Sequence, residues 1–166
     1  MVDVEKIVGE EGNELVIHKK IPNHNAVLKE LIDSVGEEYV MDNYASLFIY
    51  SGDMTENIPH LPEFVVAPLT VEEIQQIVVL ANREKIPIVP FVSGANLGGL
   101  TIPQEGGIMV DLKRMNKILE VNERDQYAIL EAGVTFSQIK NYLDKNHIFR
   151  LRDKLEANQG RFFPII

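Results

Sequence analysis

A run of small residues at positions 93–99, with the sequence SGANLGG, is the part of this chain best suited to chemistry. Glycine has no Cβ, so it lets a backbone come close to a ligand, and successive N–H groups turned inward can form a nest for phosphate. The short side chains of Ser93 and Asn96 can add hydrogen-bond donors without blocking that approach. The same glycines are also typical of a tight turn or of close strand packing, and that alternative stays open. We expect residues 93–99 to be exposed and irregular, with at least one glycine at positive φ.

The spacing of these glycines excludes two common nucleotide-binding motifs. Gly94-x-x-x-Gly98-Gly99 differs from the dinucleotide pattern G-x-G-x-x-G, and no Lys-Ser or Lys-Thr pair follows to make a P-loop. The chain has no cysteine, which excludes disulfides, thiolate metal sites and a cysteine nucleophile. No catalytic residue and no metal ligand is predicted, because the histidines lack partners at metal-binding spacing and are expected to be surface or packing residues. These histidines are His18, His24, His60 and His147.

The elements around the run predict where it lies. Residues 64–68 and 87–91 are predicted strands, with a helix over 70–85 between them. Thr70 and Glu73 are predicted to form the capping box of that helix. A strand–helix–strand unit is right-handed with parallel strands by default, so the run follows the carboxyl end of a parallel strand, where ligands bind in α/β sheets. The predicted inward face of the helix consists of Ile74, Ile77, Val78 and Ala81.

The remaining patterns predict an α+β domain with a small mixed sheet and flanking helices, two of which, near 70–84 and 135–145, pack on that sheet. Further strands are predicted at 106–112, 117–122 and 127–133. A helix over 23–36 has Asn23 or Asn25 as its cap, and a helix over 135–146 has Phe136, Ile139 and Leu143 as its apolar stripe. The apolar face of the first of these helices consists of Val27, Leu28, Leu31, Ile32 and Val35. Residues 43–63 are predicted to be irregular, and residues 4–20 hold two short apolar stretches whose type is left undecided.

Charge and hydropathy limit the partners of the chain. The 166 residues carry a net charge of −9, of which −11 falls on residues 1–80 and +2 on residues 81–166. An acidic first half argues against nucleic acid, while the second half could accept a small molecule that carries phosphate. The sequence has no apolar run of membrane-spanning length and no secretory signal, so we expect a cytoplasmic protein without a membrane span.

Four features occur in order along the chain and together resemble a known family. They are prolines at 87 and 90, Ser93-Gly94-x-Asn96-x-Gly98, Asp111-Leu112 with Met115-Asn116, and Ala132-Gly133-Val134-Thr135. This pattern, over about residues 40–147, resembles the FAD-binding domain of the vanillyl-alcohol oxidase and p-cresol methylhydroxylase (PCMH) superfamily. D-lactate dehydrogenases and the FAD subunits of glycolate oxidases are the nearest relatives in pattern. The resemblance implies the first α+β subdomain of a PCMH-type FAD-binding fold.

The resemblance also implies a cofactor and its binding residues. In that family the loop wraps the FAD pyrophosphate with backbone amides. Members with covalently attached flavin often carry a histidine in this loop, but here Asn96 occupies that place, so we expect FAD to be held non-covalently. For Asp111 and for Met115-Asn116, strand-end packing is as good an explanation as cofactor contact. The implied cofactor-binding residues are Pro90, Val92, Ser93, Gly94, Ala95, Asn96, Leu97, Gly98, Gly99 and Gly133.

The family's enzymes are longer than this chain, which shapes the functional hypothesis. We expect an N-terminal extension with a helix at 1–40, a partial FAD-binding domain at 41–147, and a tail at 148–166 that could serve in interactions. The hypothesis is the FAD-binding portion or subunit of an FAD-dependent oxidoreductase of 2-hydroxy acids or related alcohols. A second polypeptide would complete the site, or the chain would self-associate through the apolar tail residues Phe162, Phe163 and Ile165. The alternatives are a nucleotide-binding module without turnover and a truncated, inactive relic.

Overall fold

The structure is a computed structural model that describes residues 4–8, 14–18, 21–95 and 98–148. It divides into two compact units, Met1–Leu112 and Lys113–Ile166, and each is described by itself. Helices flank a small mixed sheet, so the predicted α+β fold class is confirmed. The predicted division at 40/41 and 147/148 stays a prediction.

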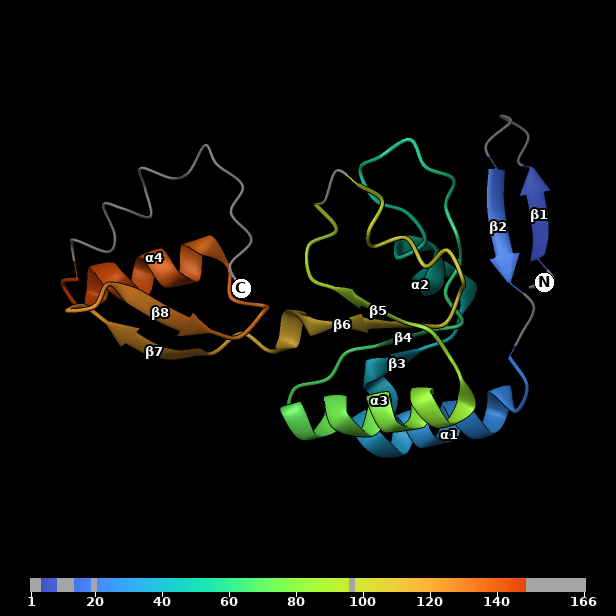
Figure 1. The fold of residues 1–166 in the computed structure, drawn as a ribbon, viewed down its shortest axis with the longest axis horizontal. Helices are drawn as coiled ribbons and strands as arrows, with labels where there is room; N and C mark the ends of the chain where they lie inside the picture. The colour runs from blue at the N-terminus through green and yellow to red at the C-terminus, as the bar shows by residue number, and fades with distance from the viewer. Residues whose placement is uncertain (1–3, 9–13, 19–20, 96–97, 149–166) are drawn as a thin grey trace. The chain divides into compact units, whose positions relative to one another are not determined.

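A four-stranded sheet in the order β3-β4-β6-β5 forms the centre of the first unit (Figure 1). Strand β6 pairs in parallel with both β4 and β5, and β3 pairs antiparallel with β4. The parallel arrangement of the two predicted strands is confirmed, but β6 lies between them. The strands are β3 Val40–Met41, β4 Phe64–Val66, β5 Ile88–Phe91 and β6 Ile108–Asp111.

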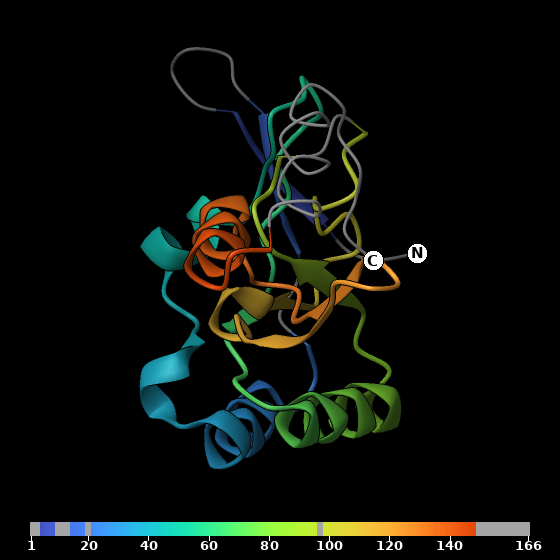
Figure 2. The same cartoon turned by 90° about the vertical axis from the view of Figure 1, so that its left-hand side faces the viewer.

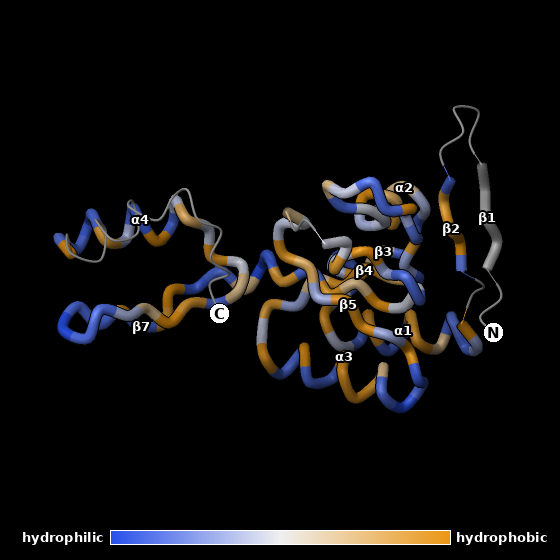
Figure 3. Tube along the Cα trace, turned by 45° about the horizontal axis from the view of Figure 1, so that its top comes forward, coloured by the Kyte–Doolittle hydropathy of each residue, from blue (hydrophilic) through white to orange (hydrophobic). Residues whose placement is uncertain are grey.

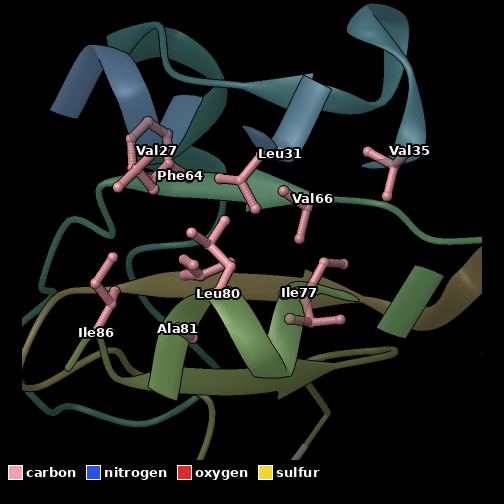
Figure 4. Close-up of a cluster of buried hydrophobic side chains, with 11 residues drawn as sticks. Val27, Leu31, Val35, Phe64, Val66, Ile77, Leu80, Ala81 and Ile86 are labelled. Atoms are coloured by element: carbon pink, nitrogen blue, oxygen red, sulfur yellow. The ribbon is translucent and has the colours of Figure 1, made fainter. Parts of the chain in front are cut away.

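Two helices, α1 His24–Val35 and α3 Val71–Glu84, cover one face of this sheet. They lie side by side, as Figure 2 shows, and their apolar side chains converge on the sheet in Figure 4. Because side chains alternate along a strand, one face receives Phe64 and Val66 from β4 while Val65 points to the other face. The main core lies between the helices and the sheet, and its fully buried members include Val27, Leu31, Phe64, Ile77 and Ile108.

The opposite face of the sheet packs against a helix that the sequence analysis did not predict. Residues 43–63 were expected to be irregular, but α2 spans Tyr44–Ile49, and the Oδ1 atom of Asn43 accepts a hydrogen bond from the N–H of Ser46 at 3.0 Å. Leu47 of this helix packs with Val65 and Met109 of the sheet. The two apolar stretches of undecided type form an antiparallel hairpin, β1 Val4–Val8 with β2 Glu14–His18.

The ends and buried faces of α1 and α3 agree with the sequence predictions except in three details. Asn23 is the N-cap residue of α1 but makes no side-chain cap bond. Thr70 accepts from the N–H of Glu73 at 3.2 Å, whereas the Glu73 carboxylate accepts from Leu69, one residue before the cap, at 2.7 Å. Val78 was expected to face inward but is 47% exposed, because the buried stripe of α3 follows the i, i+3, i+4 spacing of Ile77, Leu80 and Ala81. Hydrophobic and hydrophilic residues alternate along α1 and α3 in Figure 3.

The second unit is built from a hairpin and one helix. Strands β7 Ile118–Asn122 and β8 Tyr127–Leu130 pair only with each other among the described residues, so the expectation that they join the same mixed sheet as β4, β5 and β6 is wrong. Helix α4 Phe136–Lys145 begins with a complete capping box between Thr135 and Gln138 and buries Ile139 and Leu143. Short 3-10 helices lie at Glu37–Tyr39 and Leu112–Arg114. Within the described residues no helix is long and apolar enough to cross a membrane.

Candidate functional site

The small-residue run starts at the carboxyl edge of the parallel strands. Phe91, the last residue of β5, pairs with Asp111, the last residue of β6. The run from residue 92 therefore leaves the sheet at the edge that the sequence predicted. Asn96 and Leu97 lie outside the described residues. Of the other predicted site residues in this segment, Pro90, Ser93, Ala95 and Gly98 are exposed, Val92 and Gly94 are half-buried, and Gly99 is buried.

Two glycines of the run adopt the left-handed backbone conformation. The φ angle is 66° at Gly94 and 71° at Gly99, which confirms the expectation of at least one positive φ. The run is irregular as expected, but the expected exposure is wrong for Gly99. The reason is that the side chain of Asn57 packs on it: a Cβ at Gly99 would lie 2.6 Å from Asn57 Nδ2.

Gly98 differs from both of these glycines. Its φ lies outside the left-handed range, and a Cβ built on it would meet only Leu100 Cγ, at an ordinary 3.7 Å. Neither backbone strain nor packing among the described residues therefore requires a glycine at this position. An exposed, unobstructed backbone at the ligand-binding edge fits a residue kept small so that a phosphate can approach.

Phe91, which lies beside Gly94, contacts a buried aromatic and acidic pair. A Cβ at Gly94 would lie 2.9 Å from Phe91, whose ring meets Tyr50 edge to face at a centroid distance of 4.9 Å. The Tyr50 hydroxyl donates to Asp111 Oδ2 at 2.6 Å, and both side chains are buried. Burial, together with this hydrogen bond to the Asp111 carboxylate, raises the pKa of Tyr50, so the phenol stays protonated and keeps donating. Asp111 therefore has the packing role that was one of its two readings.

The loop carries no cation of its own. Glu105 is the only charged residue in residues 87–107. Any phosphate bound here would thus rely on neutral donors, such as backbone N–H groups and short hydroxyl or amide side chains. The hydroxyl of Ser93 already takes part in the loop, where it accepts from the N–H of Ala95 at 3.3 Å.

Gly133 has a clear packing role in the second unit. It is buried, and its N–H donates to the carbonyl of Met115 at 2.7 Å. It stands between β8 and the capping residue Thr135 of α4. Its contact with the cofactor stays a prediction.

The buried His18 and the half-buried His60 lie at the other edge of the sheet, before the strands begin. His18 Nε2 lies 3.2 Å from His60 Nδ1, and burial together with His60 lowers the pKa of His18. The buried Glu63 carboxylate accepts from the N–H of Gly107, while burial raises the pKa of Glu63. A cavity of about 180 Å³ lies beside His18, His24 and Glu63, with no residue of the loop in its lining. His18 and His60 thus pack as predicted, and in the part of the chain that the structure describes no three His, Asp or Glu side chains are placed to hold a metal ion.

Comparison with known proteins assigns the family. The family described as FAD binding domain matches residues 62–153, which is more than half of the chain. This chain belongs to the FAD-binding domain family. FAD is therefore its cofactor, and the matched segment contains the whole loop and Gly133.

The relatives of this FAD-binding domain are flavoproteins, and the resemblance to the PCMH superfamily is confirmed. This chain is 39% identical over 108 residues to glycolate oxidase subunit GlcD of Bacillus subtilis, and the match covers 65% of this chain and 23% of GlcD. It is 34% identical over 144 residues to the flavoprotein subunit of 4-cresol dehydrogenase (hydroxylating) of Pseudomonas putida, covering 83% and 28%. The crystal structure of p-cresol methylhydroxylase with substrate bound is similar at a TM-score of 0.69 and 32% identity, covering 77% and 26%. The chain thus spans less than a third of each of these proteins.

Two contributors to the site were missed by the sequence analysis. Tyr50 lies 61 positions before Asp111, and no local pattern signals a pair so far apart. Asn57 stands in a polar turn whose composition fits any surface loop. Only the fold brings either residue to the loop.

Proposed function

We propose that the loop at residues 90–99 binds the FAD pyrophosphate non-covalently, in an oxidoreductase of 2-hydroxy acids or related alcohols. The observation that carries this proposal is Gly98, an exposed glycine at the ligand edge of the sheet that neither strain nor packing among the described residues explains. Ser93 and the neighbouring backbone would hold the pyrophosphate. When bound, FAD supplies the redox chemistry, while the protein supplies orientation and electrostatics.

The printed names of the relatives support the substrate class and the need for a partner. One relative is named for glycolate, a 2-hydroxy acid, and two are named as subunits. We infer that a second polypeptide, or the remaining part of a longer one, supplies the substrate site. Non-covalent attachment is supported by Asn96, since the loop contains no histidine to form a covalent link. The cytoplasmic location stays a prediction.

The substitution Gly98→Val tests the role of the loop. A Cβ at this position meets only an ordinary contact among the described residues, whereas the valine side chain would fill the approach to the phosphate. We therefore expect FAD to bind at least about tenfold more weakly, or about 1.4 kcal/mol, with little change in the melting temperature. Fluorescence titration with FAD and thermal denaturation measure the two quantities.

Gly52→Val is the matched control, because a Cβ at Gly52 also meets only an ordinary contact, with Pro59 at 3.8 Å. It should leave FAD binding unchanged. Parallel losses of melting temperature and FAD affinity in Gly98→Val would instead assign Gly98 to packing.

A further inference from the structure

The segment around residues 53–57 forms a wall beside the loop. The exposed side chain of Asn57 lies against Gly99, and its Nδ2 atom is 2.6 Å from the position that a Cβ at Gly99 would take. Gly99 has a φ of 71°, so a larger residue would be strained there, and its Cβ would also require the Asn57 side chain to move. The segment 53–57 therefore contacts the loop through Asn57 and Gly99.

A short chain of hydrogen bonds fixes how Asn57 is oriented. The Oδ1 atom of Asp53 accepts from the backbone N–H of Thr55 at 2.9 Å and from its hydroxyl at 2.6 Å. A carboxylate only accepts, so the single hydroxyl hydrogen of Thr55 is committed to Asp53. The Thr55 oxygen can then only accept, and it does so from Asn57 Nδ2 at 2.7 Å.

This chain decides which end of the Asn57 amide meets the loop. A carboxamide can present either its oxygen or its NH2 group, but Thr55 requires the NH2 group on its side, and that group is the one beside Gly99. The NH2 group has two hydrogens, and the second has no hydrogen-bond partner among the residues that the structure describes. A donor is what an anion needs at a loop that carries no positive charge.

We propose that Asn57 is a positioning and binding residue for the pyrophosphate of FAD. It holds Gly99 in the left-handed conformation and directs its second N–H toward a phosphate oxygen. This inference rests on the proposed function of the loop and adds a second segment of chain to it. Asp53 and Thr55 act through Asn57, by keeping its donor on the side of the loop.

The test compares two replacements of Asn57 in the full 166-residue chain. Asn57→Asp keeps the shape but places a carboxylate at the loop, and Asn57→Leu keeps the bulk without donor or charge. If the donor matters, affinity for FAD and for inorganic pyrophosphate falls in the order wild type, Leu, Asp, with Asp at least about tenfold weaker than wild type. Heteronuclear NMR titration measures affinity and shows whether the amides of Gly98 and Gly99 respond.

Two further variants complete the experiment. Asn25→Asp makes the same charge change at an exposed position of α1 and should stay within about twofold of wild type. Thr55→Val removes the hydroxyl that orients the amide, and should weaken pyrophosphate binding without touching the loop directly.

Each outcome decides the inference. If wild type binds FAD and Asn57→Asp binds it equally well, Asn57 has no binding role and the proposed function stands. If Asn57→Leu is weaker than Asn57→Asp, Asn57 acts by hydrogen bonding within the fold alone, and the inference is overturned. If wild type binds neither FAD nor pyrophosphate, the proposed function of the loop fails and the inference fails with it.

Discussion

Gly107 shows what a structurally required glycine looks like in this protein. Its φ is 89°, and a Cβ there would lie 2.2 Å from the carbonyl oxygen of Pro87. That oxygen accepts from the N–H of Ile108 at 2.8 Å, so the contact belongs to the start of the pairing between β5 and β6. Gly98 has neither restriction, and the contrast separates a glycine that folding needs from one that a ligand needs.

Gly107→Ala is therefore expected to destabilise the fold. Placing an alanine in the left-handed region lowers the unfolding free energy of the protein by about 1–3 kcal/mol, and the clash with Pro87 lowers it further. Urea denaturation measures it. Gly98→Ala is the control and should lose less than about 1 kcal/mol, since it has no strain to introduce. Equal losses for the two variants would contradict this assignment.

At the residue scale, the sequence predicted the loop because small residues next to a strand are a local signal. It did not predict Tyr50 or Asn57, because their importance comes from contacts with Asp111 and Gly99 across the fold. It also expected Gly99 to be exposed, since burial by a distant side chain has no local signature.

Among the elements, β2 is joined to residues 59–61 by two backbone hydrogen bonds. Val16 donates from its N–H to the carbonyl of Pro59 and accepts from the N–H of Leu61, both at 2.9 Å. Beside this bridge, His18 of β2 meets His60. At most one of the two facing ring nitrogens can donate, so the contact needs at least one neutral imidazole.

Acid should weaken this contact. Burial and His60 lower the pKa of His18 from its ordinary value of 6.5, so the unfolded chain takes up this proton more readily than the folded one. The contribution of His18 to the unfolding free energy is complete above pH 6.5 and is lost as the pH falls through its folded pKa. Urea denaturation at pH 7.5, 6.5 and 5.5, chosen around that value, should show a smaller loss in His18→Gln than in wild type. Parallel pH profiles for the two proteins would contradict it.

Strong local signals made most elements predictable. Thr70 caps α3 as the sequence indicated, α4 begins at the predicted position, and the strands beside the loop lie where alternation and apolar runs placed them. Helix α2 was missed because residues 43–63 show mixed periodicity followed by turn residues, and its one helical signal is Asn43 as the cap. The prediction that Val78 faces inward was wrong because α3 has apolar residues on several sides. In such a helix, contacts with the sheet and α1 decide which side is buried, and the local sequence does not show this.

For the whole molecule, the fold class was predictable but the grouping of strands was not. Which strands share a sheet depends on pairing between distant segments, and the separate pairing of β7 with β8 has no local cause beyond their short turn. The cofactor site has a similar dependence. Ligands that bind tightly have about 70–90% of their surface buried, and this chain spans only 23–28% of the related proteins.

The 166-residue polypeptide by itself is therefore expected to bind FAD weakly. A dissociation constant of about one micromolar or weaker corresponds to about −8 kcal/mol or less favourable binding. Equilibrium dialysis measures this affinity, and an assay with 2-hydroxy acids should show no turnover. Stoichiometric, tightly bound flavin with turnover in the purified monomer would contradict the expectation. The predicted role of Phe162, Phe163 and Ile165 in completing the site lies outside the described residues.

The position of β6 has a consequence for how this protein is made. It follows β4 and β5 in the chain but lies between them in the sheet. Of the strands that the structure describes, β5 pairs only with β6, and β4 pairs only with β6 and the two residues of β3. While the polypeptide emerges from the ribosome, β5 therefore lacks its described partner until residues 108–111 appear. Apolar strands without partners are prone to aggregate. A nascent chain that pauses between residues 91 and 108 would thus present two apolar strands to chaperones, with the cofactor loop made before the sheet that supports it can close.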